Sequence, residues 1–97
     1  MTTANDIWLI AGLGNPEAKY DGTRHNAGFA ALDALAAKWG ISVNKSKFQG
    51  LWGQGEVEGH KVVLLKPLTF MNLSGDSIAP LAGFFKIPAD HVIVLCD

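Results

Sequence analysis

An apolar run near the amino terminus, residues 7–13, sets narrow limits on the fold because it ends abruptly in Gly, Asn and Pro. The run is far too short to span a bilayer, and it fits a strand that is buried on both faces. Residues 62–65 and 91–96 form two further apolar runs of this kind. Strands of this type need covering layers of helix, so the sequence predicts a layered α/β fold.

Two stretches have the periodicity of helices. In residues 27–39 Phe29, Leu32, Ala36 and Trp39 recur at helical spacing, and Gly40 follows where a C-terminal cap belongs. Because this stretch carries few charges, we expect neighbouring elements to cover most of it.

Residues 73–86 predict a second helix, which contains Pro80. A proline inside a helix lacks the N–H donor and clashes with the preceding turn, at a cost of ~3 kcal/mol. We therefore expect this helix to start late or to bend.

Loose alternation in residues 48–57, followed by the apolar run 62–65, predicts an antiparallel hairpin. Residues 58–60 lie near its turn, and Pro67 ends its second strand. The order is thus strand, helix, hairpin, helix, strand, which indicates a mixed sheet.

The chain of 97 residues provides for one small domain. Its net charge is -1 and its eight Lys and Arg residues are scattered, so overall charge gives no support for nucleic-acid binding. The single Cys96 and the lack of a signal sequence predict a reducing, cytoplasmic location. Because the sequence stops after a predicted strand with no helix to follow, we expect residues 1–97 to be one incomplete domain.

Three polar residues flank the predicted strands where ligands collect in α/β sheets. Asn15 follows the first strand, Asp97 follows the last, and His25 precedes the first helix. If those two strands run parallel, Asn15 and Asp97 emerge at one edge of the sheet, and His25 can come between them. A carboxylate that orients an imidazole, whose other nitrogen takes a proton from water, is a general-base arrangement.

Several short blocks, in this order, resemble the signatures of bacterial-type peptidyl-tRNA hydrolases. The blocks are Ile10-Ala11-Gly12-Leu13-Gly14-Asn15-Pro16, Tyr20, Thr23-Arg24-His25-Asn26-Ala27-Gly28, Lys66-Pro67 and Thr69-Phe70-Met71-Asn72-Leu73-Ser74-Gly75. The resemblance extends from residue 7 to residue 97.

This resemblance implies a three-layer α/β/α fold with a mixed, mainly parallel twisted sheet. It also implies a cytoplasmic, monomeric enzyme without metal or organic cofactor and without membrane attachment. Such an enzyme cleaves the ester between peptide and tRNA and so recycles peptidyl-tRNA released prematurely from ribosomes.

The resemblance also assigns roles to individual residues. It makes His25 the general base that activates water, Asp97 the carboxylate that orients it, and Asn15 the group that positions the carbonyl or the water. Asn72 holds the peptide or the ester through its amide, in a crevice that binds the acceptor end of the tRNA and the peptide. The remaining residues assigned to this crevice are Tyr20, Asn26 and Met71.

Two departures from the family pattern are evident. Glu17 replaces a common Gly, which affects the loop after the first strand. Family members also continue well beyond the position of Asp97, and most of their tRNA-binding basic surface lies in that further part. We therefore expect this chain alone to be inactive.

Other interpretations remain open. Gly12-Leu13-Gly14 after a strand is typical of dinucleotide-binding modules, although Glu17 stands where their third Gly is needed. A non-catalytic RNA-processing partner and a hydrolase that pairs Cys96 with His25 are two further alternatives.

Individual residues also have plainer interpretations. Asn15 could be a turn former and Asn72 a helix cap, and Cys96 in a buried strand is typically inert. We expect Trp8, Trp39, Trp52 and Phe70 to pack in the core, and His60 and His91 to be ordinary surface residues.

Overall fold

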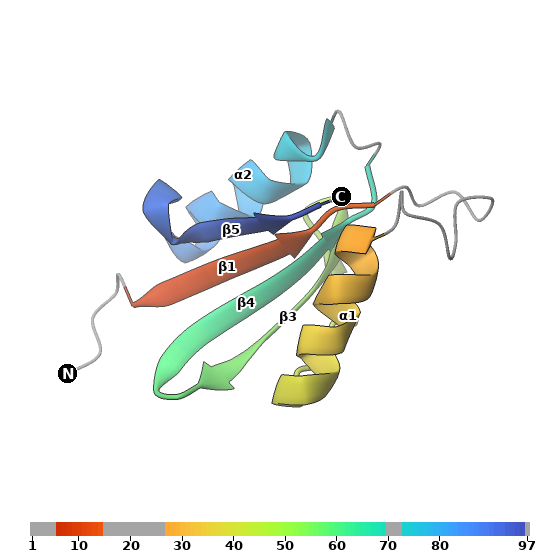
Figure 1. The fold of residues 1–97 in the computed structure, drawn as a ribbon. Helices are drawn as coiled ribbons and strands as arrows, with labels where there is room; N and C mark the ends of the chain where they lie inside the picture. The colour runs from red at the N-terminus through yellow and green to blue at the C-terminus, as the bar shows by residue number, and fades with distance from the viewer. Residues whose placement is uncertain (1–5, 15–26, 70–72, 97) are drawn as a thin grey trace.

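The computed structural model describes residues 6–14, 27–69 and 73–96. Five strands form one sheet in the order β2-β3-β4-β1-β5. Helix α1 covers one face and helix α2 the other, which confirms the three-layer α/β/α arrangement (Figure 1). The elements are β1 (Ile7–Gly12), α1 (Ala27–Trp39), β2 (Lys45–Lys47), β3 (Gly50–Val57), β4 (His60–Pro67), α2 (Gly75–Phe85), the 3-10 turn η4 (Ala89–His91) and β5 (Val92–Leu95).

The sheet is mixed, as predicted. Strand β1 runs parallel to β4 on one side and to β5 on the other, whereas β3 runs antiparallel to β2 and β4. Alternate residues of β1 and β4 face opposite layers: Leu9 and Val63 pack under α2, and Ile10 and Leu64 pack under α1. Both strands are therefore buried on two faces, which explains their continuous apolar runs.

Helix α1 has the predicted bounds, and Gly40 ends it with a φ of 67°. The N–H of Ile41 donates to the carbonyl of Ala36 at 2.9 Å, which completes the expected cap. The expectation that neighbours cover most of the helix is wrong, because only the stripe of Gly28, Leu32 and Ala36 is buried. Its solvent-facing positions are mainly alanines, which favour helix without needing burial; they are Ala27, Ala30, Ala31, Ala34 and Ala37.

The predicted hairpin is present as β3 and β4. Glu58 and Gly59 form its two-residue turn with positive φ of 51° and 84°, as the twist of a tight hairpin requires. His60 lies in β4 rather than in the turn. Strand β2 was not predicted, because three polar residues in a row carry no apolar pattern.

Helix α2 begins two residues later than predicted and continues through Pro80. Because Pro80 has no N–H, the carbonyl of Asp76 lacks its usual helical donor. The side-chain amide of Gln49 donates to that carbonyl at 3.4 Å, which gives it a partner. None of the described helices is long and apolar enough to cross a membrane.

The carboxyl-terminal strand corrects two expectations. Strand β5 was predicted to be buried, but Ile93 and Val94 are 43% and 44% exposed. Among the described strands it lies at the edge of the sheet, where it pairs with β1. Cys96, which follows this strand, is consequently exposed rather than buried.

Candidate active site

Three neighbouring parallel strands, β4, β1 and β5, end at the same edge of the sheet (Figure 1). Ala11 is paired with Leu65, and Gly12 is paired with Leu95. The N–H of Leu13 donates to the carbonyl of Leu95 at 2.8 Å, which extends the pairing to the ends of β1 and β5. In parallel α/β sheets this carboxyl edge is where ligands bind.

The start of α1 packs directly against this edge. Gly12 and Gly28 lie so close that a Cβ on Gly12 would contact the carbonyl oxygen of Gly28 and approach the Cβ of Leu32 to 2.7 Å. A Cβ on Gly28 would collide with the carbonyl oxygens of Leu13 and Leu95. Only glycine fits at these two positions, and their close contact places the first turn of α1 over the ends of β1 and β5.

The end of β4 is tied to its neighbours in a similar way. The N–H of Leu68 donates to the carbonyl of Gln49 at 2.9 Å. A Cβ on Gly50 would lie 2.7 Å from the carbonyl oxygen of Lys66 on β4 and 3.1 Å from the hydroxyl oxygen of Ser77 on α2, which is fully buried. The first turn of α2, which contains Ser77, therefore packs beside the start of β3 and the end of β4.

All seven residues predicted for the site lie outside the described residues. They are Asn15, Tyr20, His25, Asn26, Met71, Asn72 and Asp97. Phe70, predicted to lie in the core, is outside them as well. Their proximity to one another stays a prediction.

The described neighbours of these seven residues nevertheless belong to one region. Gly14 follows β1, Ala27 opens α1, Thr69 follows β4 and Cys96 follows β5. The condition set from the sequence, that the strands before Asn15 and Asp97 run parallel, is confirmed.

One charged group at this edge was given no role from the sequence. The ammonium nitrogen of Lys66 lies 3.1 Å from a carboxylate oxygen of Asp33 and 5.1 Å from the ring centre of Phe29. A cation–π contact and an ion pair together hold this lysine against α1, with 21% of its side chain exposed. The sequence already indicated this lysine, since Lys66 directly follows the apolar run 62–65 of β4.

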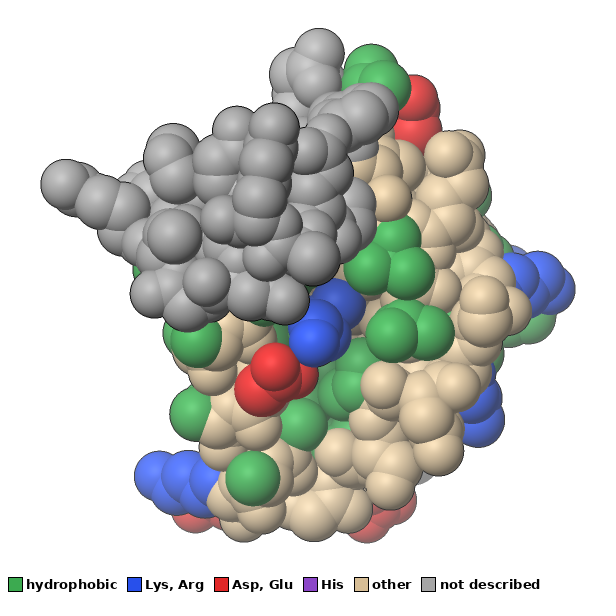
Figure 2. All heavy atoms as spheres, turned by 90° about the vertical axis from the view of Figure 1, so that its right-hand side faces the viewer, with side chains coloured by type: hydrophobic (Ala, Val, Ile, Leu, Met, Phe, Trp, Pro, Cys, Tyr) green, Lys and Arg blue, Asp and Glu red, His purple; other side chains and the backbone are tan. Residues whose placement is uncertain are grey.

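Figure 2 views the molecule from the side that faces right in Figure 1, toward which β1, β4 and β5 run. Hydrophobic side chains lie there beside basic and acidic ones. Among residues 6–14, 27–69 and 73–96, no three His, Cys, Asp or Glu side chains come together as a metal site would require.

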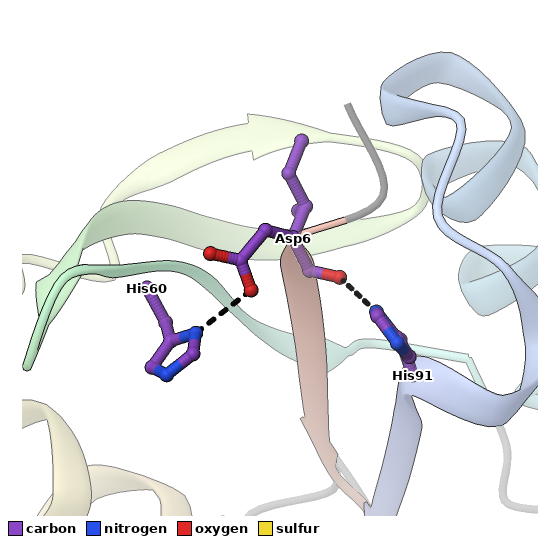
Figure 3. Close-up of polar contacts among 4 residues, drawn as sticks. Asp6, His60 and His91 are labelled. Atoms are coloured by element: carbon purple, nitrogen blue, oxygen red, sulfur yellow. Dashed lines mark hydrogen bonds and ion pairs between the residues drawn. The ribbon is translucent and has the colours of Figure 1, made fainter. Parts of the chain in front are cut away.

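The two described histidines lie at the opposite, amino-terminal end of the parallel strands (Figure 3). His60 donates from Nδ1 to the carboxylate of Asp6 at 2.8 Å. His91 donates from Nδ1 to the carbonyl of Ile7 at 3.0 Å, and its ring stacks on Trp8 with centres 4.0 Å apart. His60 is exposed, as predicted, whereas His91 is half-buried against Trp8 rather than an ordinary surface residue. Neither histidine adjoins the carboxyl edge.

Comparison with known proteins adds independent information. A model of the family described as peptidyl-tRNA hydrolase matches residues 9–97. A peptidyl-tRNA hydrolase of Bacillus anthracis is 58% identical over 89 residues, which are 92% of this chain and 48% of that protein. One of Caldanaerobacter subterraneus subsp. tengcongensis is 54% identical over 91 residues, 94% of this chain and 49% of that protein.

The fold has solved counterparts too. The crystal structure of peptidyl-tRNA hydrolase from Acinetobacter baumannii matches with a TM-score of 0.86 and 44% identity, over 97% of this chain and 48% of that one. The chain thus spans about half the length of the relatives it matches.

Proposed function

Because the chain belongs to the peptidyl-tRNA hydrolase family, we propose that the protein hydrolyses the ester bond between peptide and tRNA in peptidyl-tRNA. The family match over residues 9–97 is the observation that carries this proposal. The reaction recycles tRNA released prematurely from ribosomes, and the protein acts as a monomer in the cytoplasm.

The proposed mechanism uses a single activated water. His25 takes a proton from the water, Asp97 orients the imidazole, and Asn15 positions the water or the ester carbonyl. One positioned general base contributes ~10²–10⁴-fold to the rate, and oriented amide donors stabilise the charge that develops on the carbonyl oxygen. An ester has a better leaving group than an amide, so this apparatus requires no covalent nucleophile.

The arrangement of the described residues supports this assignment. Strands β1 and β5 are adjacent and parallel, so Gly14 and Cys96 follow strands that end side by side. The tight packing of Gly28 places the start of α1, just after His25 and Asn26, over the same two strand ends. Asn72, with Tyr20, Asn26 and Met71, completes the proposed crevice for the peptide and the acceptor end of the tRNA.

A hybrid protein tests this proposal most sharply. In it, the chain replaces the matching part of the Bacillus anthracis relative, to which it is 58% identical over 89 residues. Release of N-acetylated amino acid from tRNA is then measured. We expect the hybrid to hydrolyse this substrate and His25→Ala to lower turnover ~10²–10⁴-fold because the base is lost. Residues 1–97 alone, which we propose to be one incomplete domain, should show negligible hydrolysis.

His60→Ala is the matched control, because it removes an imidazole from the opposite end of the sheet. Its ion pair is partly exposed, so the change should leave turnover intact. Full activity in the folded His25→Ala hybrid would contradict the assignment of the base.

A further inference from the structure

Two lysines on edge strand β2 lie over aromatic rings. The ammonium nitrogen of Lys45 is 4.7 Å from the ring centre of Trp52. That of Lys47 is 5.3 Å from the ring centre of Phe48 and 5.0 Å from that of Phe84. Because side chains two positions apart in a strand point to the same side, both ammonium groups belong to one surface. We call Lys45, Lys47, Phe48, Trp52 and Phe84 the lysine–aromatic patch.

The rings of this patch support one another. Phe48 lies 6.1 Å from Trp52 and 5.6 Å from Phe84, measured between ring centres. Phe85 packs edge-on against Trp52 and Phe84 at 5.3 and 5.0 Å. Trp52 and Phe85 also pack against the hydrophobic core, so the base of the patch is fixed. Phe84 nevertheless remains 61% exposed.

The two ammonium groups of the patch have no carboxylate partner in the part of the chain that the structure describes. Lys66 and His60 each contact a carboxylate, whereas Lys45 and Lys47 pair with no carboxylate of residues 6–14, 27–69 or 73–96. All three residues of β2 are exposed. The patch is therefore a local concentration of positive charge on a chain whose net charge is -1.

The patch adjoins the carboxyl edge of the sheet. Lys47 pairs with Gly50, which pairs with Pro67 at the end of β4. Gln49, in the turn between β2 and β3, bonds to Leu68 at 2.9 Å and to the carbonyl of Asp76 at 3.4 Å. A polyanion whose reactive end lies at this edge could thus contact the patch at the same time.

We propose that the lysine–aromatic patch binds phosphates of the tRNA part of the substrate, an inference that rests on the proposed function. Lysines without carboxylate partners suit phosphate contacts, which position a nucleic acid without reading its sequence. Side chains two residues apart are separated by about 6.6 Å along a strand, so two consecutive phosphates can be contacted. The rings hold the two ammonium groups in place, which lowers the entropy lost on binding.

Binding of fluorescently labelled, deacylated tRNA to the 97-residue chain tests the inference, by anisotropy over a series of salt concentrations. The plot of log K against log salt has a negative slope, and each lost phosphate contact reduces the magnitude of this slope by about 0.9. We therefore expect the double variant Lys45→Gln/Lys47→Gln to bind tRNA more weakly, with a slope whose magnitude is smaller by about 2. Lys45→Arg/Lys47→Arg keeps both charges and should retain the slope.

Lys38→Gln/Lys61→Gln is the matched control, since it removes the same charge from exposed positions on α1 and at the amino end of β4. It should leave the slope unchanged. Circular dichroism verifies that each variant is folded. The inference would be overturned if folded Lys45→Gln/Lys47→Gln kept the slope of the unmodified chain, or if the control lost as much slope as this variant. An unaltered slope in Lys45→Gln/Lys47→Gln would favour an acidic protein as the partner of the patch.

The assay involves no ester cleavage, so it separates this inference from the proposed function. Slopes as expected together with an inactive hybrid would refute the hydrolase proposal alone. An active hybrid with an unaltered slope would refute the role of the patch alone.

Discussion

Replacement of Gly28 by alanine perturbs the contact that places α1 over the ends of β1 and β5. The new Cβ would meet the carbonyl oxygens of Leu13 and Leu95 and lie 2.6 Å from the backbone nitrogen of Leu13. These are backbone atoms of paired strands, so no side chain can rotate away. The helix itself must move.

The size of the effect follows from two opposing contributions. Overpacking of this kind lowers the free energy of unfolding by about 1–3 kcal/mol. The loss for Gly28→Ala should lie at the upper end of this range, because the contacted atoms belong to the backbone of Leu13 and Leu95. Alanine gains about 0.5–1 kcal/mol over glycine in a helix. The net loss in the free energy of unfolding is therefore about 2 kcal/mol, or about thirtyfold in the folding equilibrium.

Urea denaturation measures this loss directly. With a slope of about 1 kcal/mol per molar urea for a small domain, the midpoint should fall by about 2 M. Gly83→Ala is the control, because a Cβ on this exposed residue of α2 meets nothing within 4 Å. It should raise stability by about 0.5–1 kcal/mol. If Gly28→Ala were as stable as the unmodified chain, the close approach of α1 to the strand ends would be refuted.

Two further predictions concern the core and the exposed thiol. Leu64→Ala should lower the free energy of unfolding, measured by urea denaturation, by about 2–5 kcal/mol, because Leu64 is fully buried under α1. Ile93→Ala, on the exposed edge strand, should lower it by less than about 1 kcal/mol. Equal losses would refute the assigned layers. Cys96→Ala in the hybrid should leave hydrolysis of N-acetylated aminoacyl-tRNA intact, since the proposed mechanism uses no thiol. Loss of turnover in a folded Cys96→Ala variant would favour a hydrolase that uses Cys96 as its nucleophile.

Elements with a strong local signal were predicted well. The apolar runs of β1 and β4 and the bounds of α1 with its Gly40 cap follow from periodicity and glycine chemistry. Parallel pairing of β1 with β5 was only a condition of the site prediction, and the structure shows that it is met. These features depend on residues close in sequence or on general rules of topology.

Features that depend on tertiary position were not predicted. The apolar residues of β5 indicated burial, but whether an apolar strand is central or at an edge depends on its partners. Lys45-Ser46-Lys47 carries no strand pattern, and its pairing with β3 places the lysines over Trp52, Phe48 and Phe84. Composition alone had indicated scattered, solvated charge.

The family resemblance, rather than local pattern, supplied most of the candidate site. Periodicity and topology could place Asn15 and Asp97 at one edge, but the crevice roles of Asn72 and Met71 came from motif likeness. The strands that precede Asn15 and Asp97 end side by side, as a shared edge for these two residues requires.

The central claim is that His25 and Asp97 act as one unit on water. In the hybrid, turnover of N-acetylated aminoacyl-tRNA is measured for His25→Ala, Asp97→Ala and the double variant. Because an orienting carboxylate has no effect without its imidazole, the double variant should lose no more activity than His25→Ala alone. Losses that multiply in the double variant would show that the two residues act independently, and would contradict the account.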